Sequence, residues 1–380
     1  MARREGVCLD GPHGLMASES LTTEITQNHG DARRLPGETR HGSRGFPSPC
    51  ASVVLRDLRG ENPSGGTDTG GLSGQTLNAA PQDGPDRRDF RGKEAGWRLA
   101  APRPVGDPGV FLARLRAEAR GAPVALGVDL PLGVPRAYAA HRPEAGFLPF
   151  LETLRVRPDF FRVCETLADI HPGRPFYPAR GVKGMTRASH AAALGFAGAG
   201  DLSRLCDRAT PERPAGAPLF WTLGANQTGK AALAAWRDML LPALAREPPL
   251  VRLWPFEGRF RALLAPGTVT LAETYPAEAL RHLGIRLRGS KRRQADRAAA
   301  APMLLAAMTR LNVAPEPALV RAVTDGLGGD AAGEDRFDCL LGVLCVINVL
   351  AGHRPDDTPD DPWVTSWEGW VLGQTALPVG

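Results

Sequence analysis

The stretch that most constrains the fold is the short apolar run Val124-Ala-Leu-Gly-Val, which leads into Asp129 and then into a break at 130–135. The run is too short for a helix and rich in Val and Leu, which predicts a buried strand. The two prolines and the glycine that follow end this strand. Asp129 is therefore expected at the carboxyl end of a central strand, where open α/β sheets place their ligand crevices. The alternative is that Asp129 only caps the turn before Pro131.

Strands and helices alternate on both sides of this run. A strand is predicted at 96–100, and the helix after it has Phe111, Leu112 and Leu115 on its apolar face. Further strands are predicted at 250–258 and 268–276, and helices over 298–311 and 316–326. This alternation predicts an α/β fold with a mixed sheet flanked by helices.

Composition divides the chain into two parts. The 380 residues include 44 Gly and 35 Pro, and the stretch 1–94 is dominated by Gly, Pro, Ser, Asp and Arg. Residues 1–94 show no sustained apolar period, and we interpret them as a disordered segment or as sequence translated from an unsuitable start or frame. Two apolar runs within it, 6–10 and 53–57, each end on Asp and are the only candidate strands there. The globular domain is expected over 95–380, with a helical insertion at about 143–218.

Charge and cysteine content exclude several classes of protein. The formal net charge of +5 permits a nucleic-acid partner without arguing for one. The six cysteines form no CxxC pair, which argues against a zinc ribbon or a disulfide framework, and Cys339 and Cys345 are interpreted as core residues. The uncharged run 339–352 is shorter than the ~20 residues that cross a bilayer, and no signal segment is seen. We expect a cytoplasmic protein without a membrane partner, and the oligomeric state stays open.

Acidic residues recur where other elements meet the predicted sheet. The strand at 268–276 ends on Glu273 before Pro276. A long helix that begins near Glu334 carries Asp335 and Asp338 on one face of its first turn and is apolar on every side from Cys339 onward. Asp335 could be a simple cap, but a carboxylate buried at 338 needs a partner or a metal. Separated acids of this kind suit phosphoryl transfer by Mg²⁺ or Mn²⁺, which prefer oxygen ligands.

Two further patterns bear on ligands. The loop 171–187 contains Arg180 and Lys183 beside aromatic residues, a composition typical of surfaces that contact phosphates. A solvated loop explains this composition as well. The basic stretch 286–297 is expected to be a solvated helix start. Residues 224–230 fit GxxxxGK after a strand-like run, but Ala231 stands where a P-loop needs Ser or Thr. We interpret these glycines as a tight turn before a helix over 230–244, which leaves an NTPase as a minor alternative.

Several motifs together resemble the predicted nucleases catalogued as domain of unknown function 429. They are Gly127-Val-Asp-Leu-Pro-Leu-Gly-Val-Pro135, Leu219-Phe-Trp-Thr-Leu-Gly-Ala-Asn-Gln227, Trp254-Pro-Phe-Glu-Gly258, Glu273-Thr-Tyr-Pro-Ala-Glu278, Asp335-Arg-Phe-Asp338 and Trp367-Glu-Gly-Trp370. The resemblance covers about 96–374 and implies a ribonuclease H-like fold with an acidic metal site. It also implies that Asp129, Glu273 and Asp338 map to acidic positions of that site, with Asp335 nearby.

The sequence departs from that family at its start. Ribonuclease H-like proteins open with a hairpin whose first strand carries a catalytic Asp, and no strand before Gly96 is framed in that way. We therefore predict a metal-dependent nuclease that lacks a first ligand and is inactive if that ligand is essential. The alternative is a non-catalytic nucleic-acid- or protein-binding module on the same fold. The predicted residues are Asp129, Glu273 and Asp338 for catalysis, the same three with Asp335 for Mg²⁺ or Mn²⁺, and Arg180 with Lys183 for substrate.

Overall fold

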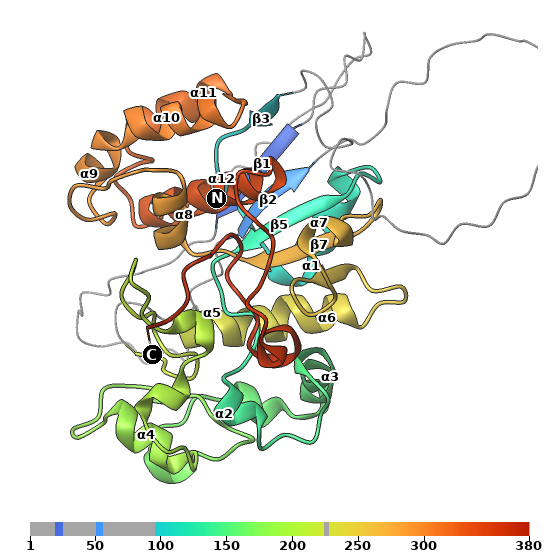
Figure 1. Cartoon of the computed structure of the whole chain (residues 1–380), viewed down its shortest axis with the longest axis vertical. Coiled ribbons are helices and arrows are strands. Elements are labelled where there is room, and N and C mark those ends of the chain that lie inside the picture. The colour runs from blue at the N-terminus through green and yellow to red at the C-terminus, as the bar shows by residue number, and fades with distance from the viewer. Residues whose placement is uncertain (1–19, 26–50, 56–95, 224–227, 380) are drawn as a thin grey trace, which may run out of the picture.

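The computed structural model describes residues 20–25, 51–55, 96–223 and 228–379 (Figure 1). A mixed sheet runs through its centre in the order β6-β7-β5-β2-β1-β3-β8, with β4 beside β1. Only β2 is antiparallel to its neighbours, and the other pairs of named strands are parallel. The strands are β1 Ser20–Ile25, β2 Ala51–Leu55, β3 Trp97–Leu99, β4 Arg103–Pro104, β5 Val124–Val128, β6 Val251–Leu253, β7 Val269–Glu273 and β8 Val313–Pro315.

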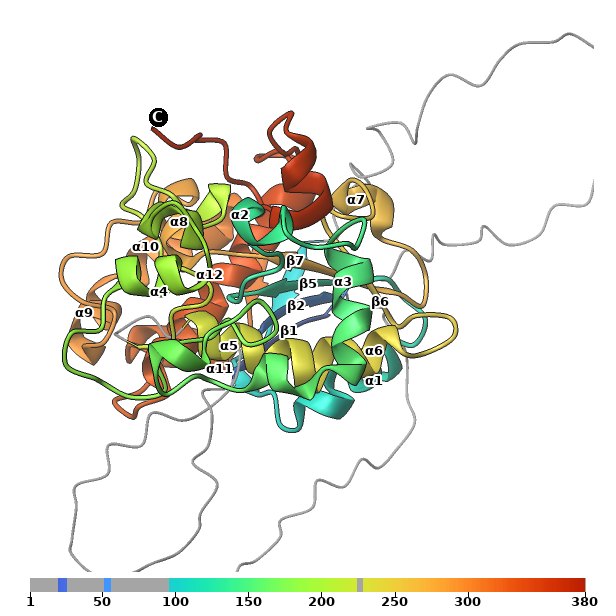
Figure 2. The same cartoon turned by 90° about the horizontal axis from the view of Figure 1, so that it is seen from below.

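Helices cover both faces of this sheet and build the part of the molecule below it (Figures 1 and 2). The α-helices are α1 Pro108–Glu118, α2 Arg136–Ala139, α3 Phe147–Thr153, α4 Arg187–Ala193, α5 Thr228–Ala235, α6 Leu241–Leu244, α7 Phe260–Leu263, α8 Pro276–His282, α9 Gln294–Ala299, α10 Ala301–Arg310, α11 Pro317–Thr324 and α12 Gly333–Leu350. Short 3₁₀ helices are η1 Leu154–Val156, η2 Pro158–Phe161, η3 Leu167–Asp169, η4 Ala199–Leu202 and η5 Leu205–Asp207, and single π-turns are η6 Trp236–Leu240 and η7 Val364–Glu368.

The central strand β5 separates two hydrophobic cores. Its residues Val124, Leu126 and Val128 pack with α1, the α5–α6 segment and the insertion. Ala125 faces the second core, which α8, α10, α11 and α12 fill. Successive side chains of β5 point to opposite faces of the sheet, and a hydrophobic core covers each face. All five residues of the strand are therefore buried.

Gly127 sets how closely α12 approaches the sheet. A Cβ at this position would lie 2.9 Å from Val346 Cγ2 and 3.0 Å from Thr274 Cγ2. The missing side chain lets the buried helix α12 lie against β5. The first turns of α12 and the end of β5 are held in one region by this packing.

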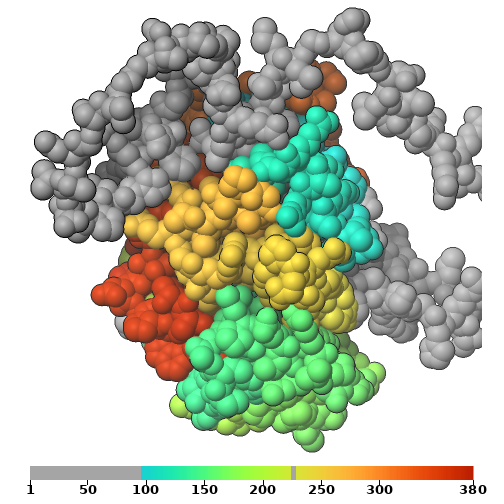
Figure 3. Space-filling view, turned by 90° about the vertical axis from the view of Figure 1, so that its right-hand side faces the viewer, coloured from blue at the N-terminus to red at the C-terminus, as the bar shows by residue number. Residues whose placement is uncertain are grey.

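The region 143–218, predicted as a helical insertion, consists of short helices and loops. Its short helices and loops, η1 to η5 with α3 and α4, form the lower part of the molecule, green in the space-filling view (Figure 3). The carboxy-terminal segment, red in the same view, lies beside it and pairs with the sheet through a bridge between Glu273 and Val371.

The main elements of the domain agree with the predictions, with differences in extent. The predicted strands at 96–100, 124–128 and 268–276 are β3, β5 and β7, and Phe111, Leu112 and Leu115 are the buried face of α1. The strand expected at 250–258 is only Val251–Leu253, because a turn follows directly at Trp254. The helix expected over 298–311 is two helices, α9 and α10, which meet at Ala300, next to Pro302 at the start of α10.

Two predictions differ in kind from the structure. The segment 1–94 was interpreted as lacking ordered structure, yet β1 and β2 lie within it and pair with each other and with β5 or β3. Ala51–Leu55 covers the described part of the apolar run 53–57, and β1 and β5 pair with it on either side. The run at 219–223 is a turn with an isolated bridge from Trp221 to Tyr177 and no strand. The run 6–10, Asp57 and the glycine motif at 224–227 lie outside the described residues.

Candidate functional site

Three of the predicted acidic residues gather where β5 meets the start of α12. Asp129 follows the last residue of β5, and Asp335 and Asp338 lie in the first two turns of the helix. Asp129 and Asp335 are partly buried, and Asp338 is buried with 7 % of its surface exposed. We refer to these three carboxylates as the acidic cluster.

The carboxylates of the acidic cluster are close enough to change each other's ionisation. Burial, followed by the charges of Asp338, Glu273 and Asp335, raises the pKa of Asp129 to about 7 against the opposing charge of Lys291. Burial and the charge of Asp338 likewise raise the pKa of Asp335 to about 7. Burial also raises the pKa of Asp338 above its ordinary value. Asp129 and Asp335 are therefore only partly ionised near pH 7.

Asp338 is only half satisfied within this cluster. Its Oδ2 atom pairs with the ammonium group of Lys291. Its Oδ1 atom is buried and has no hydrogen-bond partner among the residues that the structure describes. A buried carboxylate oxygen without a partner carries a desolvation cost, and a bound cation would remove that cost.

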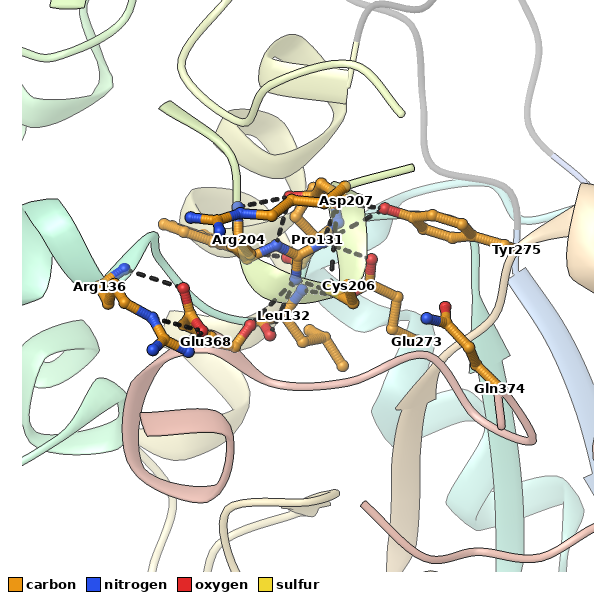
Figure 4. Close-up of polar contacts among 12 residues, drawn as sticks. Pro131, Leu132, Arg136, Arg204, Cys206, Asp207, Glu273, Tyr275, Glu368 and Gln374 are labelled. Atoms are coloured by element: carbon orange, nitrogen blue, oxygen red, sulfur yellow. Dashed lines mark hydrogen bonds and ion pairs between the residues drawn. The ribbon is translucent and has the colours of Figure 1, made fainter. Parts of the chain in front are cut away.

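Glu273 is in a different situation from the acidic cluster (Figure 4). Both of its oxygens accept hydrogen bonds from the guanidinium of Arg204, each at 2.7 Å, and Oε2 also accepts one from the backbone N–H of Leu132 at 2.8 Å. Arg204 and Glu273 are both fully buried. Glu273 would have to leave Arg204 before it could bind a metal ion, so the structure gives it the role of an ion-pair partner.

Arg204 is the centre of this second network, in which Glu273 lies opposite Val128, the residue before Asp129. The same guanidinium pairs with Asp207, with its Nε 2.9 Å from Oδ2 and its Nη2 2.9 Å from Oδ1. The hydroxyl of Tyr275 donates to Asp207. In Figure 4, Arg204 lies between Asp207 and Glu273, while Glu368 faces Arg136 at the edge of the group. The network ties the insertion to the end of β7 and stabilises the fold around the predicted site.

The predicted substrate residues lie on the surface of the insertion. Arg180 and Lys183 are exposed, and Arg180 Nη2 is 3.4 Å from Glu165 Oε2 in an exposed ion pair. An exposed pair of this kind contributes little to stability and leaves the arginine able to contact a polyanion.

The basic stretch 286–297 is in part the solvated helix start that the sequence predicts, because α9 begins at Gln294, but Lys291 and Arg297 turn inward. It is a loop followed by α9, and its Lys291 points to the acidic cluster. Arg297 is buried and binds three backbone carbonyls, those of Gly326, Lys291 and Gly328. Arg286, Arg288, Arg292 and Arg293 are exposed.

The donor chemistry of the acidic cluster fits a hard divalent cation. Three carboxylates, one of them with an unpaired buried oxygen, are the ligands that Mg²⁺ and Mn²⁺ prefer. Within the ranges that the structure describes, no three His, Cys, Asp or Glu side chains are placed to hold a metal ion. Binding would therefore require the carboxylates to move together, and the ammonium of Lys291 now lies among them.

Comparison with known proteins assigns no family to this chain. The chain matches no family model, no curated protein and no solved structure. Across the described ranges, none of the helices combines the length and the apolar character that crossing a membrane requires. The cysteines described, Cys164, Cys206, Cys339 and Cys345, are free thiols buried in the protein.

The sequence did not identify the cations of the two networks. Lys291 lay in a basic stretch that resembled a solvated surface, and Arg204 lay in an insertion without a clear pattern. The spacing of Arg204 and Asp207, three residues apart, was the one local signal of an ion pair. Their long-range partners, Asp338 and Glu273, are distant in sequence and could not be assigned from it.

Proposed function

We propose that the protein is a metal-dependent nuclease-like hydrolase of phosphodiester bonds whose cation site is formed by Asp129, Asp335 and Asp338. The observation that carries the proposal is the gathering of three buried or partly buried carboxylates at the end of β5. Two of its carboxylates have a pKa of about 7, and the third has a buried oxygen without a partner among the described residues. Clusters of perturbed carboxylates at the carboxyl end of a central strand are typical of functional sites.

The arrangement of the sheet supports a ribonuclease H-like fold as part of this proposal. A single antiparallel strand, β2, lies between parallel strands, and the acids come from the end of β5 and from the long helix α12 packed on the sheet. The resemblance to the predicted nucleases of domain of unknown function 429 leads to the same assignment for Asp129 and Asp338. Neither β1 nor β2 contains an Asp, so the expected first-strand ligand is not supplied by these two strands.

In the proposed reaction the chain holds the cation and positions the substrate. Asp129, Asp335 and Asp338 supply carboxylate oxygens. Asp129 and Asp335 ionise fully only above about pH 7, because burial first and then neighbouring negative charges raise their pKa values. A bound divalent cation would stabilise the negative charge that develops on the phosphate and would lower the pKa of a water molecule. Arg180, Lys183 and the exposed arginines of 286–293 contact phosphates along a nucleic-acid strand.

A cleavage assay tests this proposal. The purified chain is incubated at pH 8 with Mn²⁺ or Mg²⁺ and with single-stranded DNA, duplex DNA, RNA or bis(p-nitrophenyl) phosphate. We expect cleavage that depends on the cation and falls at least ~100-fold in D129N, because ligands of such a site act as a unit. The matched control is D159N, which removes the charge of an exposed Asp that pairs with Arg162. Equal activity of D129N and the parent would contradict the proposal.

A second candidate function is a non-catalytic nucleic-acid- or protein-binding module. The observation that favours it is the occupation of Glu273 by Arg204, which removes one predicted ligand from the acidic set. The nucleic-acid form of this module would bind DNA or RNA in the presence of EDTA without cleaving it, with an affinity that falls as salt rises. Loss of that binding in a variant with Arg180→Ser and Lys183→Ser, without any cleavage by the parent, would favour this candidate.

A further inference from the structure

Lys291 brings a positive charge into the acidic cluster from a separate part of the chain. It lies between α8 and α9, far in sequence from both Asp129 and α12. Its ammonium group pairs with Asp338 Oδ2 and lies 3.5 Å from Glu334 Oε1. Burial alone would lower the pKa of Lys291, but the carboxylates of Asp338 and Asp129 raise it above its ordinary value. The side chain is therefore charged and is held by several carboxylates at once.

The backbone of Lys291 is fixed by buried contacts. Its carbonyl accepts a hydrogen bond of 2.5 Å from Arg297 Nη1. The same guanidinium binds the carbonyls of Gly326 at 2.8 Å and Gly328 at 2.6 Å, in the turn that leads into α12. The N–H of the preceding residue, Ser290, donates to Asp296 at 2.8 Å. One buried arginine thus sets the position of Lys291 relative to the helix that carries Asp335 and Asp338.

Several carboxylates surround this ammonium group. Four carboxylates interact with it or with each other at the site, those of Asp129, Glu334, Asp335 and Asp338. The other cations near the cluster are placed elsewhere: Arg336 pairs with Asp330 at 2.6 Å, Arg292 is exposed and lies 3.7 Å from Glu334, and Arg297 binds backbone carbonyls. Lys291 is the cation that contacts Asp338, whose other oxygen is left without a hydrogen-bond partner in the described part of the chain.

We infer that Lys291 is a built-in counterion of the acidic cluster, which holds the carboxylates in the metal-free protein and gives them up when a divalent cation binds. The second half of this statement rests on the proposed function. Lys291 is a positioning residue in this account. It competes with the metal ion for Asp338, so the affinity for the cation is set by the cost of displacing an ammonium group that the fold has placed there.

Two measurements on the full chain test the inference. The first is thermal unfolding in EDTA of the parent, K291M, D338N and the double variant, because Met keeps most of the aliphatic stem and removes the charge. The second is isothermal titration with Mn²⁺ on the parent and K291M. The matched control is R292M, which removes the neighbouring exposed charge, and K291R tests whether a positive charge is sufficient.

The expected results are specific to a counterion. K291M should unfold several degrees below the parent in EDTA, D338N should recover most of that loss in the K291M background, and K291R should lie near the parent. Folded K291M should bind Mn²⁺ at least ~10-fold more tightly than the parent, since no ammonium group has to be displaced. R292M should change neither quantity appreciably.

Each contrary outcome has a separate meaning. Unchanged or weaker Mn²⁺ binding by folded K291M would overturn the competition. Strictly additive melting shifts in K291M and D338N would overturn the role as counterion. If neither protein binds Mn²⁺, the proposed function fails. The unfolding temperatures of the parent, K291M, D338N and the double variant then decide alone whether Lys291 neutralises the cluster.

Discussion

Replacing Arg204 by Met should destabilise the domain strongly. Arg204 is completely buried and pairs with two buried carboxylates, Glu273 at 2.7 Å and Asp207 at 2.9 Å. Removing one partner of a buried ion pair costs about 3–5 kcal/mol, because the remaining charge is left without compensation. Here two carboxylates lose their cation, so we expect a loss of at least about 3–5 kcal/mol in the free energy of unfolding, or roughly 10 °C in Tm.

The assay is urea unfolding followed by tryptophan fluorescence and circular dichroism. R180M is the control, since Arg180 forms only an exposed pair with Glu165 and should lose less than about 1 kcal/mol. E273Q should cost stability in the parent and recover part of the loss in the R204M background, because the charge it removes is then buried without a partner. A loss below about 1 kcal/mol in R204M would refute the interpretation of Glu273 as a structural ion-pair partner.

Three further predictions follow from buried groups. Burial lowers the pKa of His190 to about 4, so the folded protein should lose up to about 3 kcal/mol as pH falls from 6.5 to 4, and H190Q should flatten this dependence in unfolding measurements at several pH values. The pKa of Asp129 is raised from 3.8 to about 7, so its charge opposes folding increasingly as pH rises through that window, and D129N should gain stability relative to the parent at pH 8 but not at pH 3.5. G127A should lose about 1–3 kcal/mol in urea unfolding, because its Cβ would lie 2.9 Å from Val346 Cγ2 on α12. A flat pH dependence of the parent, the same D129N shift at both pH values or an unchanged midpoint for G127A would each contradict the corresponding prediction.

Local sequence pattern was sufficient for the parts of the fold that local patterns determine. The buried run Val124–Val128 had to be a strand because it is short, apolar and closed by prolines, and the all-apolar helix from Cys339 had to be buried. The placement of Asp129 and Asp338 at one end of the sheet followed from these two elements. Strand β1 was not expected and β2 was only a candidate in the run 53–57, because their partners, β3 for β1 and β5 for β2, are distant in sequence and the segment around them has no apolar period.

The partners of the acidic residues could not be predicted, for a physical reason. A carboxylate at a strand end looks the same in sequence whether it binds a metal ion or an arginine. The sequence predicted a metal ion for Glu273, and in the structure Glu273 pairs with Arg204. The distinction depends on contacts between residues far apart along the chain, which one sequence does not encode in any local pattern. The same holds for Lys291, whose basic neighbours indicated a solvated surface.

The most direct test of the account is Mn²⁺ binding at pH 8 by isothermal titration on the parent, D129N and E273Q, each first shown to be folded. The acidic cluster of Asp129, Asp335 and Asp338 predicts that the parent binds Mn²⁺, that D129N binds at least ~10-fold more weakly, and that folded E273Q binds like the parent because Glu273 is held by Arg204. No binding by the folded parent, or equal binding by the parent and D129N, would contradict the claim that this cluster is a cation site.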